Sequence, residues 1–140
     1  MQIGLIDHIN IQTKNLEKTC WFYETVLGMK VGWRPPFPFP GAWLYVGDRP
    51  VVHLIGRDPR DPDAPPANSG TVDHVAFAGQ GFLELVQRLE RASIPFDVRD
   101  VPGLQQRQLF LRDPNNVKVE IVLTGADATV GAAKYPVYTI

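Results

Sequence analysis

The sequence repeats itself. Asp7-His8 lies in the apolar run LIDHINI, and Asp73-His74 lies in the similar run TVDHVAF, 66 residues later. The runs LYVGD (44–48) and LFLRD (109–113) lie 65 residues apart, and His53 and Glu120, each in an apolar run after a turn, lie 67 residues apart. Three matches at nearly one offset, in polar as well as apolar positions, predict that one order of structural elements occurs twice.

Within the first repeat, alternation of side chains predicts a strand over residues 4–12. Helical spacing over residues 15–27, with Asn15 as N-cap and Gly28 at the C-terminal end, predicts a helix. A strand over residues 29–33 and a hairpin of residues 42–47 and 51–55, with its turn at 47–50, complete the unit.

The second repeat has the same predicted order: a strand (71–78), an amphipathic helix (81–92), a strand (96–100) and a hairpin (107–112 and 117–123). We therefore expect an α+β fold of two βαβββ modules, residues 4–56 and 71–124, forming an open cup. The Pro- and Asp-rich segment 57–70 between them is expected to be an exposed linker. No structure is expected for the tail, 125–140.

Four polar residues occupy repeat-equivalent positions in these apolar strands: His8, His53, His74 and Glu120. One such histidine alone is more simply a satisfied core residue, and Glu120 alone could be solvated or paired with Lys118 or an arginine. Together they are all three histidines of the chain and a carboxylate that is costly to bury without a cation. If the two repeats pack around a two-fold axis, these side chains predict a site for one divalent transition metal, Zn, Ni, Mn or Fe.

The chain resembles the vicinal oxygen chelate superfamily, which includes glyoxalase I, extradiol dioxygenases, fosfomycin-modifying enzymes and bleomycin-resistance proteins. The resemblance covers about residues 4–124, and its most specific parts are FYETVLGM (22–29) and LRDPNNVKVEI (111–121). It implies a single glyoxalase-like domain made of the two modules. It also implies a homodimer, as for many members of that superfamily.

The resemblance implies that His8, His74 and Glu120 are the metal ligands. It places His53 where the superfamily varies between ligands and non-ligands, so His53 is expected as a fourth ligand or as a catalytic acid–base group. Glyoxalase I has a carboxylate at that position, and this chain departs from it. A chain of 140 residues is also about half the usual length of a two-domain extradiol dioxygenase.

Alternation along the strands also predicts which side chains face the substrate. The candidates are Asn10, Trp43, Tyr45, Gln108 and Phe110, with Trp33 and the Pro-rich loop 34–41 as a lid. Ordinary core or dimer contacts explain these aromatic residues equally well. Arg107 and Arg112 could pair with an anionic substrate, although exposed arginines usually bind nothing specific.

Composition narrows the function further. The net charge is −1 without a basic stripe, which argues against nucleic acid, and no apolar run approaches ~20 residues, which argues against a membrane span. A single cysteine and no apparent secretion signal predict a cytoplasmic protein. The expected function is a metal-dependent lyase, isomerase or dioxygenase acting on a small substrate chelated through neighbouring oxygens. The alternatives are a non-catalytic antibiotic-binding resistance protein and a fosfomycin-type transferase.

Overall fold

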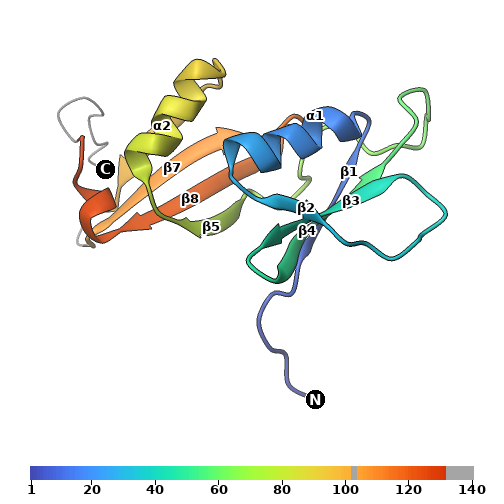
Figure 1. Cartoon of the computed structure of the whole chain (residues 1–140), viewed down its shortest axis with the longest axis horizontal. Coiled ribbons are helices and arrows are strands. Elements are labelled where there is room, and N and C mark those ends of the chain that lie inside the picture. The colour runs from blue at the N-terminus through green and yellow to red at the C-terminus, as the bar shows by residue number, and fades with distance from the viewer. Residues whose placement is uncertain (102–103, 132–140) are drawn as a thin grey trace. The chain divides into compact units, whose positions relative to one another are not determined.

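The computed structural model describes residues 1–101 and 104–131 and separates into two compact units, Met1–Ala67 and Asn68–Ile140. Each unit runs strand, helix, strand, strand, strand and forms one four-stranded sheet (Figure 1). In both sheets the first strand pairs in parallel with the last, and the other pairs are antiparallel. The α+β class and the two βαβββ modules are confirmed.

The sheet of the first unit has the order β1-β4-β3-β2. Its strands are β1 (Ile9–Thr13), β2 (Lys30–Gly32), β3 (Gly41–Val46) and β4 (Arg49–Gly56). The strand predicted from residue 4 begins later, at the pair Ile9–Val52, so His8 lies one residue before it. Pro50 limits the ladder here, since it has no N–H and its carbonyl already accepts a hydrogen bond from the His53 ring.

The helical segment of the first unit has two parts. Asn15 caps α1 (Leu16–Trp21) as predicted, because its side-chain oxygen accepts a hydrogen bond from the Lys18 N–H at 2.9 Å. The helix predicted over 15–27 is found, and its second half, η1 (Phe22–Val26), widens into a π-helix. The wider turn is compatible with burying three of its side chains, Phe22, Tyr23 and Val26.

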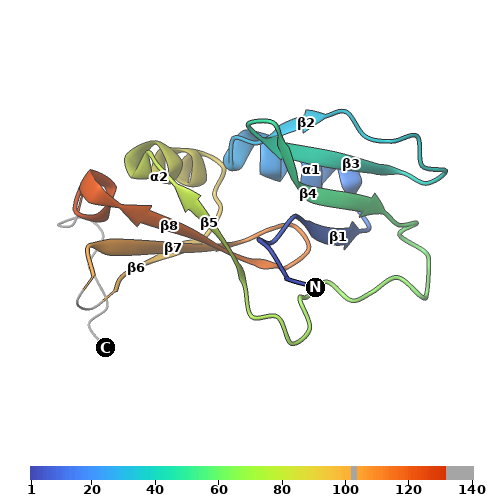
Figure 2. The same ribbon diagram turned by 90° about the horizontal axis from the view of Figure 1, so that it is seen from below.

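The sheet of the second unit has the order β5-β8-β7-β6. Its elements are β5 (Val75–Gly79), α2 (Phe82–Arg91), β6 (Phe96–Asp100), β7 (Gln106–Arg112) and β8 (Lys118–Thr124). Figure 2 shows α2 on one side of this sheet. The parallel ladder starts at Val75–Val119, one residue into β8, so the predicted strand 71–78 is shortened and His74 lies just before it.

The segment after β8 contributes to the second unit, although no structure was expected for it. It forms the short 3₁₀-helix η2 (Gly125–Ala128), in which the Asp127 carboxylate accepts hydrogen bonds from the N–H groups of Gly81 and Phe82 at 3.0 and 2.9 Å. Asp127 thus caps α2 from 45 residues away in the sequence, where local patterns gave no signal. The remaining notable tail residues, Tyr135, Pro136 and Tyr138, lie outside the described residues.

Arg107 belongs to the core, so the expectation that it could bind an anionic substrate is wrong. Its side chain is fully buried, because alternation along β7 turns it toward α2, opposite to Gln108. The guanidinium lies 4.7 Å from the centre of the Phe82 ring, and its Nε donates to the Asp100 carboxylate at 3.0 Å. These contacts stabilise the packing of the second unit.

Residues 57–74, which connect β4 to β5 in the sequence, form turns and bends, in agreement with the expected irregular linker. In the part of the chain that the structure describes, no helix has the length and apolar character needed to cross a bilayer.

Asp127→Ala should destabilise the second unit by about 1 kcal/mol, because two N–H groups at the start of α2 lose their acceptor. These hydrogen bonds lower the pKa of Asp127, so their contribution is present above the ordinary carboxyl pKa and is lost as the pH falls through the lowered value. Urea unfolding at several pH values measures both effects. The exposed Asp63→Ala is the control, and equal stability of the two variants near neutral pH would contradict the capping role.

Candidate functional site

Three rings stack on the face of the first sheet opposite α1. The His53 ring lies between His8, with 3.8 Å between ring centres, and Trp43, at 4.0 Å. Strand register explains the contact between Trp43 and His53, since these residues are cross-strand partners on β3 and β4. Asn10 is the partner of His53 on β1 and is exposed, which places this predicted residue beside the stack.

His53 is held as a neutral imidazole in this stack. It is 9% exposed, and burial together with the nearby His8 lowers its pKa. Its Nε2 donates to the Pro50 carbonyl at 3.0 Å, so the proton resides on Nε2 and the lone pair on Nδ1. As a ligand or as a base, His53 would therefore act through Nδ1.

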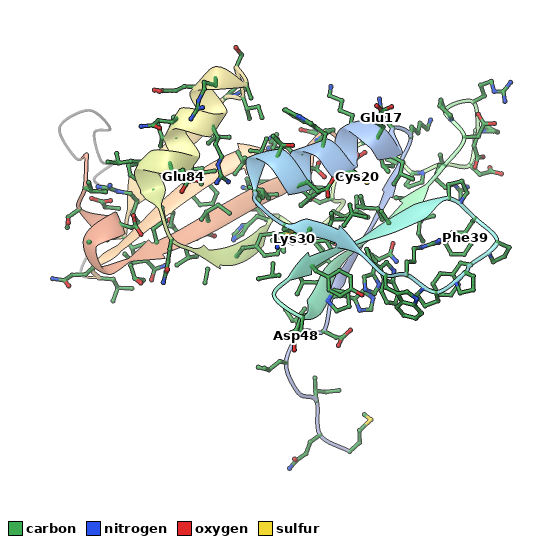
Figure 3. The ribbon with its side chains drawn as sticks, in the orientation of Figure 1. Glu17, Cys20, Lys30, Phe39, Asp48 and Glu84 are labelled. Atoms are coloured by element: carbon green, nitrogen blue, oxygen red, sulfur yellow. The ribbon has the colours of Figure 1, made fainter. Side chains whose placement is uncertain are left out.

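Aromatic side chains from the Pro-rich loop surround Trp43. The ring centres of Trp33 and Phe37 lie 6.2 and 6.4 Å from that of Trp43, and Phe39 stacks on Phe37 at 5.3 Å. Phe39 is labelled on this loop in Figure 3. The Tyr45 hydroxyl donates to the Trp33 carbonyl at 2.7 Å and helps to fix the start of the loop.

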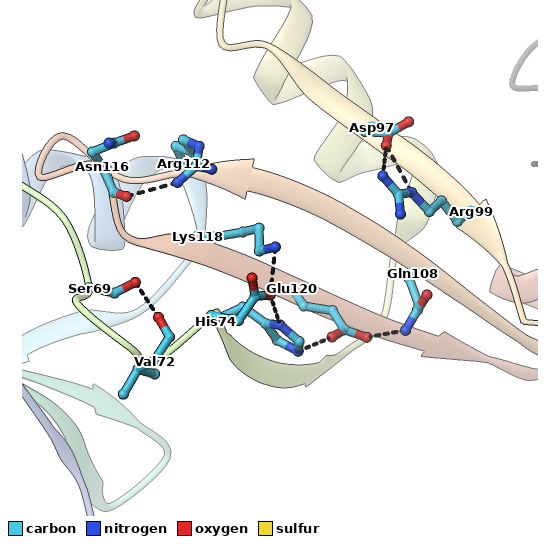
Figure 4. Close-up of polar contacts among 11 residues, drawn as sticks. Ser69, Val72, His74, Asp97, Arg99, Gln108, Arg112, Asn116, Lys118 and Glu120 are labelled. Atoms are coloured by element: carbon cyan, nitrogen blue, oxygen red, sulfur yellow. Dashed lines mark hydrogen bonds and ion pairs between the residues drawn. The ribbon is translucent and has the colours of Figure 1, made fainter.

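In the second unit, Glu120 is the polar centre (Figure 4). Its side chain is 4% exposed, yet its carboxylate lies 2.8 Å from His74 Nε2 and accepts a hydrogen bond from Gln108 Nε2 at 2.8 Å. The salt bridge to Lys118 that sequence reasoning considered is not the arrangement found, since Lys118 Nζ lies 2.5 Å from Asp73. Phe110, the cross-strand partner of Glu120, places its ring centre 5.9 Å from that of His74.

His74 lies between two carboxylates. Its Nδ1 is 2.7 Å from Asp73 Oδ2, and its Nε2 is 2.8 Å from Glu120 Oε2. With Nδ1 donating to Asp73, the short contact between His74 Nε2 and Glu120 requires either a shared hydrogen-bonding proton or a metal ion bound by both groups. The donor set of nitrogen and carboxylate oxygen thus fits a divalent transition metal.

Each of the two repeat-equivalent histidines is preceded by an aspartate that orients it. His8 Nδ1 lies 2.6 Å from Asp7 Oδ2, as His74 Nδ1 does from Asp73. A carboxylate at Nδ1 fixes the tautomer that leaves Nε2 for a metal, which is the usual arrangement around metal-binding histidines. Sequence reasoning overlooked this role for Asp7 and Asp73, although the repeated Asp-His pair was its signal.

The predicted site residues thus form two clusters, one in each unit: His8, His53, Trp43 and Asn10 in the first, and His74, Glu120, Gln108 and Phe110 in the second. Among the described residues, no group of three or more His, Cys, Asp and Glu side chains is placed to share one metal ion. Each cluster has two of the four predicted ligands.

The two clusters occupy equivalent strand positions in the two sheets but differ in chemistry. In both sheets the candidate ligand of the last strand faces an aromatic residue on its hairpin partner, Trp43 opposite His53 and Phe110 opposite Glu120. The first cluster is dominated by stacked rings, and the second by charged groups.

The family comparison agrees with this geometry. The model of the Glyoxalase/Bleomycin resistance protein/Dioxygenase superfamily matches residues 5–121. The chain belongs to this superfamily. The match covers both βαβββ units and begins before His8 and ends after Glu120, so all four candidate ligands lie inside the superfamily domain.

Sequence identity to individual members of the superfamily is low. The Arabidopsis thaliana protein named Glyoxylase I 4 is 28% identical over 126 residues, which are 86% of this chain and 71% of that protein. A glyoxylase/bleomycin resistance protein/dioxygenase domain from Frankia sp. has a TM-score of 0.71 at 20% identity, covering 89% of this chain and all of that one. Lactoylglutathione lyase from Agrobacterium tumefaciens has a TM-score of 0.62 at 20% identity, covering 87% and 95%. These two structures support the superfamily fold.

Trp43→Leu should raise the pKa of His53 toward the ordinary histidine value, because the imidazole loses the ring that shields it from water. In the native chain the unfolded state binds this proton at a higher pH than the folded state does. Protonation therefore favours unfolding as the pH falls below the ordinary histidine range.

NMR titration of the imidazole signals measures this pKa. Trp21→Leu, which alters a half-exposed tryptophan on α1, should leave it unchanged. An ordinary pKa for His53 in the native chain would contradict the shielding.

Proposed function

We propose that the chain is a metal-dependent enzyme that acts on a small substrate bound through two neighbouring oxygens. The observation that carries the proposal is the buried Glu120 carboxylate facing His74 Nε2, with the opposite nitrogen of that ring held by Asp73. A carboxylate with this little exposure is stable only beside positive charge. Membership of the superfamily makes a divalent metal the natural source of that charge.

The proposed ligand set is the one that the superfamily resemblance implies: His8, His74 and Glu120. Two imidazole nitrogens and one carboxylate leave open positions on the ion, which is how catalytic metal sites admit a substrate. The metal, when bound, acts as a Lewis acid toward the substrate oxygens or, as iron, supports oxygen chemistry. Zn, Ni, Mn and Fe all suit these donors.

The chain's own residues have distinct proposed tasks around the ion. Gln108 holds one oxygen of Glu120 and so orients the other toward His74. His53 is neutral with a lone pair on Nδ1, so it can accept a proton as a general base or serve as a fourth ligand. Trp43 and Phe110 line the two clusters with flat apolar surface, which suits a small planar or acyl substrate.

Lyase or isomerase chemistry of the glyoxalase type and dioxygenase-like chemistry both fit this arrangement. A binding protein without catalysis is the alternative, and the exposed rings of Trp33, Phe37 and Phe39 favour it. We further propose a cytoplasmic homodimer, from the single cysteine and the superfamily resemblance.

Protein purified without chelator or added metal should contain about one Zn, Ni, Mn or Fe ion per chain. Glu120→Gln keeps the shape of the side chain and removes its charge, so it should reduce the bound metal strongly, as should His74→Ala. Elemental analysis measures the content, and Glu17→Gln, at an exposed position on α1 (Figure 3), should leave it unchanged. Stoichiometric metal in both site variants would refute the ligand assignment. Failure of the native protein to take up any of these ions would favour the binding-protein alternative.

Asp73→Asn should weaken metal binding about 10- to 100-fold, because the carboxylate that orients His74 is replaced by an amide. Hydrogen bonds from Lys118 and His74 lower the pKa of Asp73 to about 2, so Asp73 stays ionised at the pH values of such assays. Competition with a chromophoric chelator measures the affinity. Asp7→Asn tests the equivalent pair around His8, and Asp63→Asn is the exposed control. Unchanged affinity in the Asp73 variant would show that this aspartate only stabilises the surface.

A further inference from the structure

The second unit contains a cavity of about 660 Å³ next to the Glu120 cluster. This volume is in the range that small-molecule sites occupy. Aromatic, cationic and metal-ligating groups meet there, and the lining includes His74, Phe96, Arg99, Phe110, Arg112 and Lys118. All of its lining residues belong to the second unit.

Positive charge exceeds negative charge in the lining, which has three cationic and two acidic side chains before His74 is counted. Lys118 pairs with Asp73 at 2.5 Å, and Arg99 pairs with Asp97 at 2.9 Å. Arg112 has no acidic partner among the described contacts. Its Nη1 donates to the Asn116 carbonyl at 3.0 Å. A carbonyl carries no net charge, so the positive charge of Arg112 is the one left for an anion.

The Phe110 ring forms a flat apolar surface beside these cations. The Arg99 guanidinium lies 5.4 Å from the ring centre, Lys118 Nζ lies 5.9 Å from it, and the His74 ring meets it nearly edge-on. A planar group can pack against an aromatic side chain at a favourable offset, and neighbouring cations attract any negative charge on that group. The surroundings of Phe110 therefore suit a planar anion better than a neutral or cationic ligand.

Strand register sets the spacing of this anion site from the metal ligand. Lys118 and Glu120 are two residues apart on one face of β8, which corresponds to roughly 7 Å. Arg112 is the cross-strand partner of Lys118 (Figure 4). Phe110 is the cross-strand partner of Glu120. A ligand with an anionic group near Arg112 and a planar part on Phe110 would thus extend along the sheet toward Glu120.

We propose that this cavity binds a planar carboxylate, with its anionic group at Arg112 and its flat part against Phe110. The inference deepens the proposed function by naming the substrate class as planar and anionic, and only that link to catalysis rests on the proposed function. The cavity, its charge and its aromatic surface require no metal ion.

Fluorine NMR can test the proposal with two probes of nearly equal shape, 4-fluorobenzoate and 4-fluorobenzamide. The full chain is used after chelator treatment, so that binding of the carboxylate to a metal ion cannot contribute. The benzoate should bind at least tenfold more tightly than the neutral benzamide, and the difference should shrink at high salt. Equal affinity for the two probes would overturn the proposal.

Arg112→Gln should weaken benzoate binding about tenfold, since one charge-assisted hydrogen-bonding group is lost, and Arg112→Lys should restore part of it. Arg91→Gln is the matched control, because this exposed arginine on α2 also donates to a backbone carbonyl but lies outside the cavity. Unchanged binding in Arg112→Gln, or an equal loss in Arg91→Gln, would refute the role of Arg112.

A further variant locates the planar part of the ligand. Phe110→Leu should weaken both probes, because it removes the flat surface while leaving every charge in place. Metal content of the native protein is measured in parallel, so that this test and the proposed function can fail separately. If the native protein binds metal but does not prefer benzoate over benzamide, only the anion site is refuted. Retained selectivity without any metal uptake would refute only the enzyme.

Discussion

Parallel pairing of the first and last strands is the constraint on which both units depend. Parallel neighbours need a crossover connection, and in each unit that connection contains the helix. The helix covers one face of the sheet, and the buried side chains of the inner strands, such as Leu44, Val52, Leu109 and Ile121, form the core. The other face is left for alternate residues, and His53, Glu120, Trp43 and Phe110 all lie there because of their position in the alternation.

The buried charge of Glu120 is the main energetic demand that this arrangement creates. Gln108 supplies a neutral hydrogen bond, and His74 supplies the only ring nitrogen within 3 Å that the structure describes for the carboxylate. Two carboxylates, from Asp73 and Glu120, then face one imidazole. Lys118 balances the charge of Asp73, which leaves the buried carboxylate of Glu120 as the group beside which a bound cation would be favourable.

The two copies of the βαβββ module carry chemically different side chains at equivalent positions. In the first unit, His53 is packed between rings and kept neutral, so its free nitrogen can accept a proton. In the second unit, charged pairs surround Phe110 and one arginine keeps an unbalanced charge. The internal repeat therefore supplies the scaffold, while the residues that differ between the repeats give each unit its own chemistry.

The sequence by itself determined the order of the elements, the faces of the strands and the four candidate ligands. These follow from local periodicity and from the equivalence of the two repeats, both of which can be read along the chain. Tertiary structure decided what depends on contacts distant in sequence: the capping of α2 by Asp127, the burial of Arg107 and the pairing of Lys118 with Asp73 rather than Glu120. Side-chain direction at a strand position is periodic, but the choice among several nearby charged partners depends on distances and burial that only the folded chain establishes.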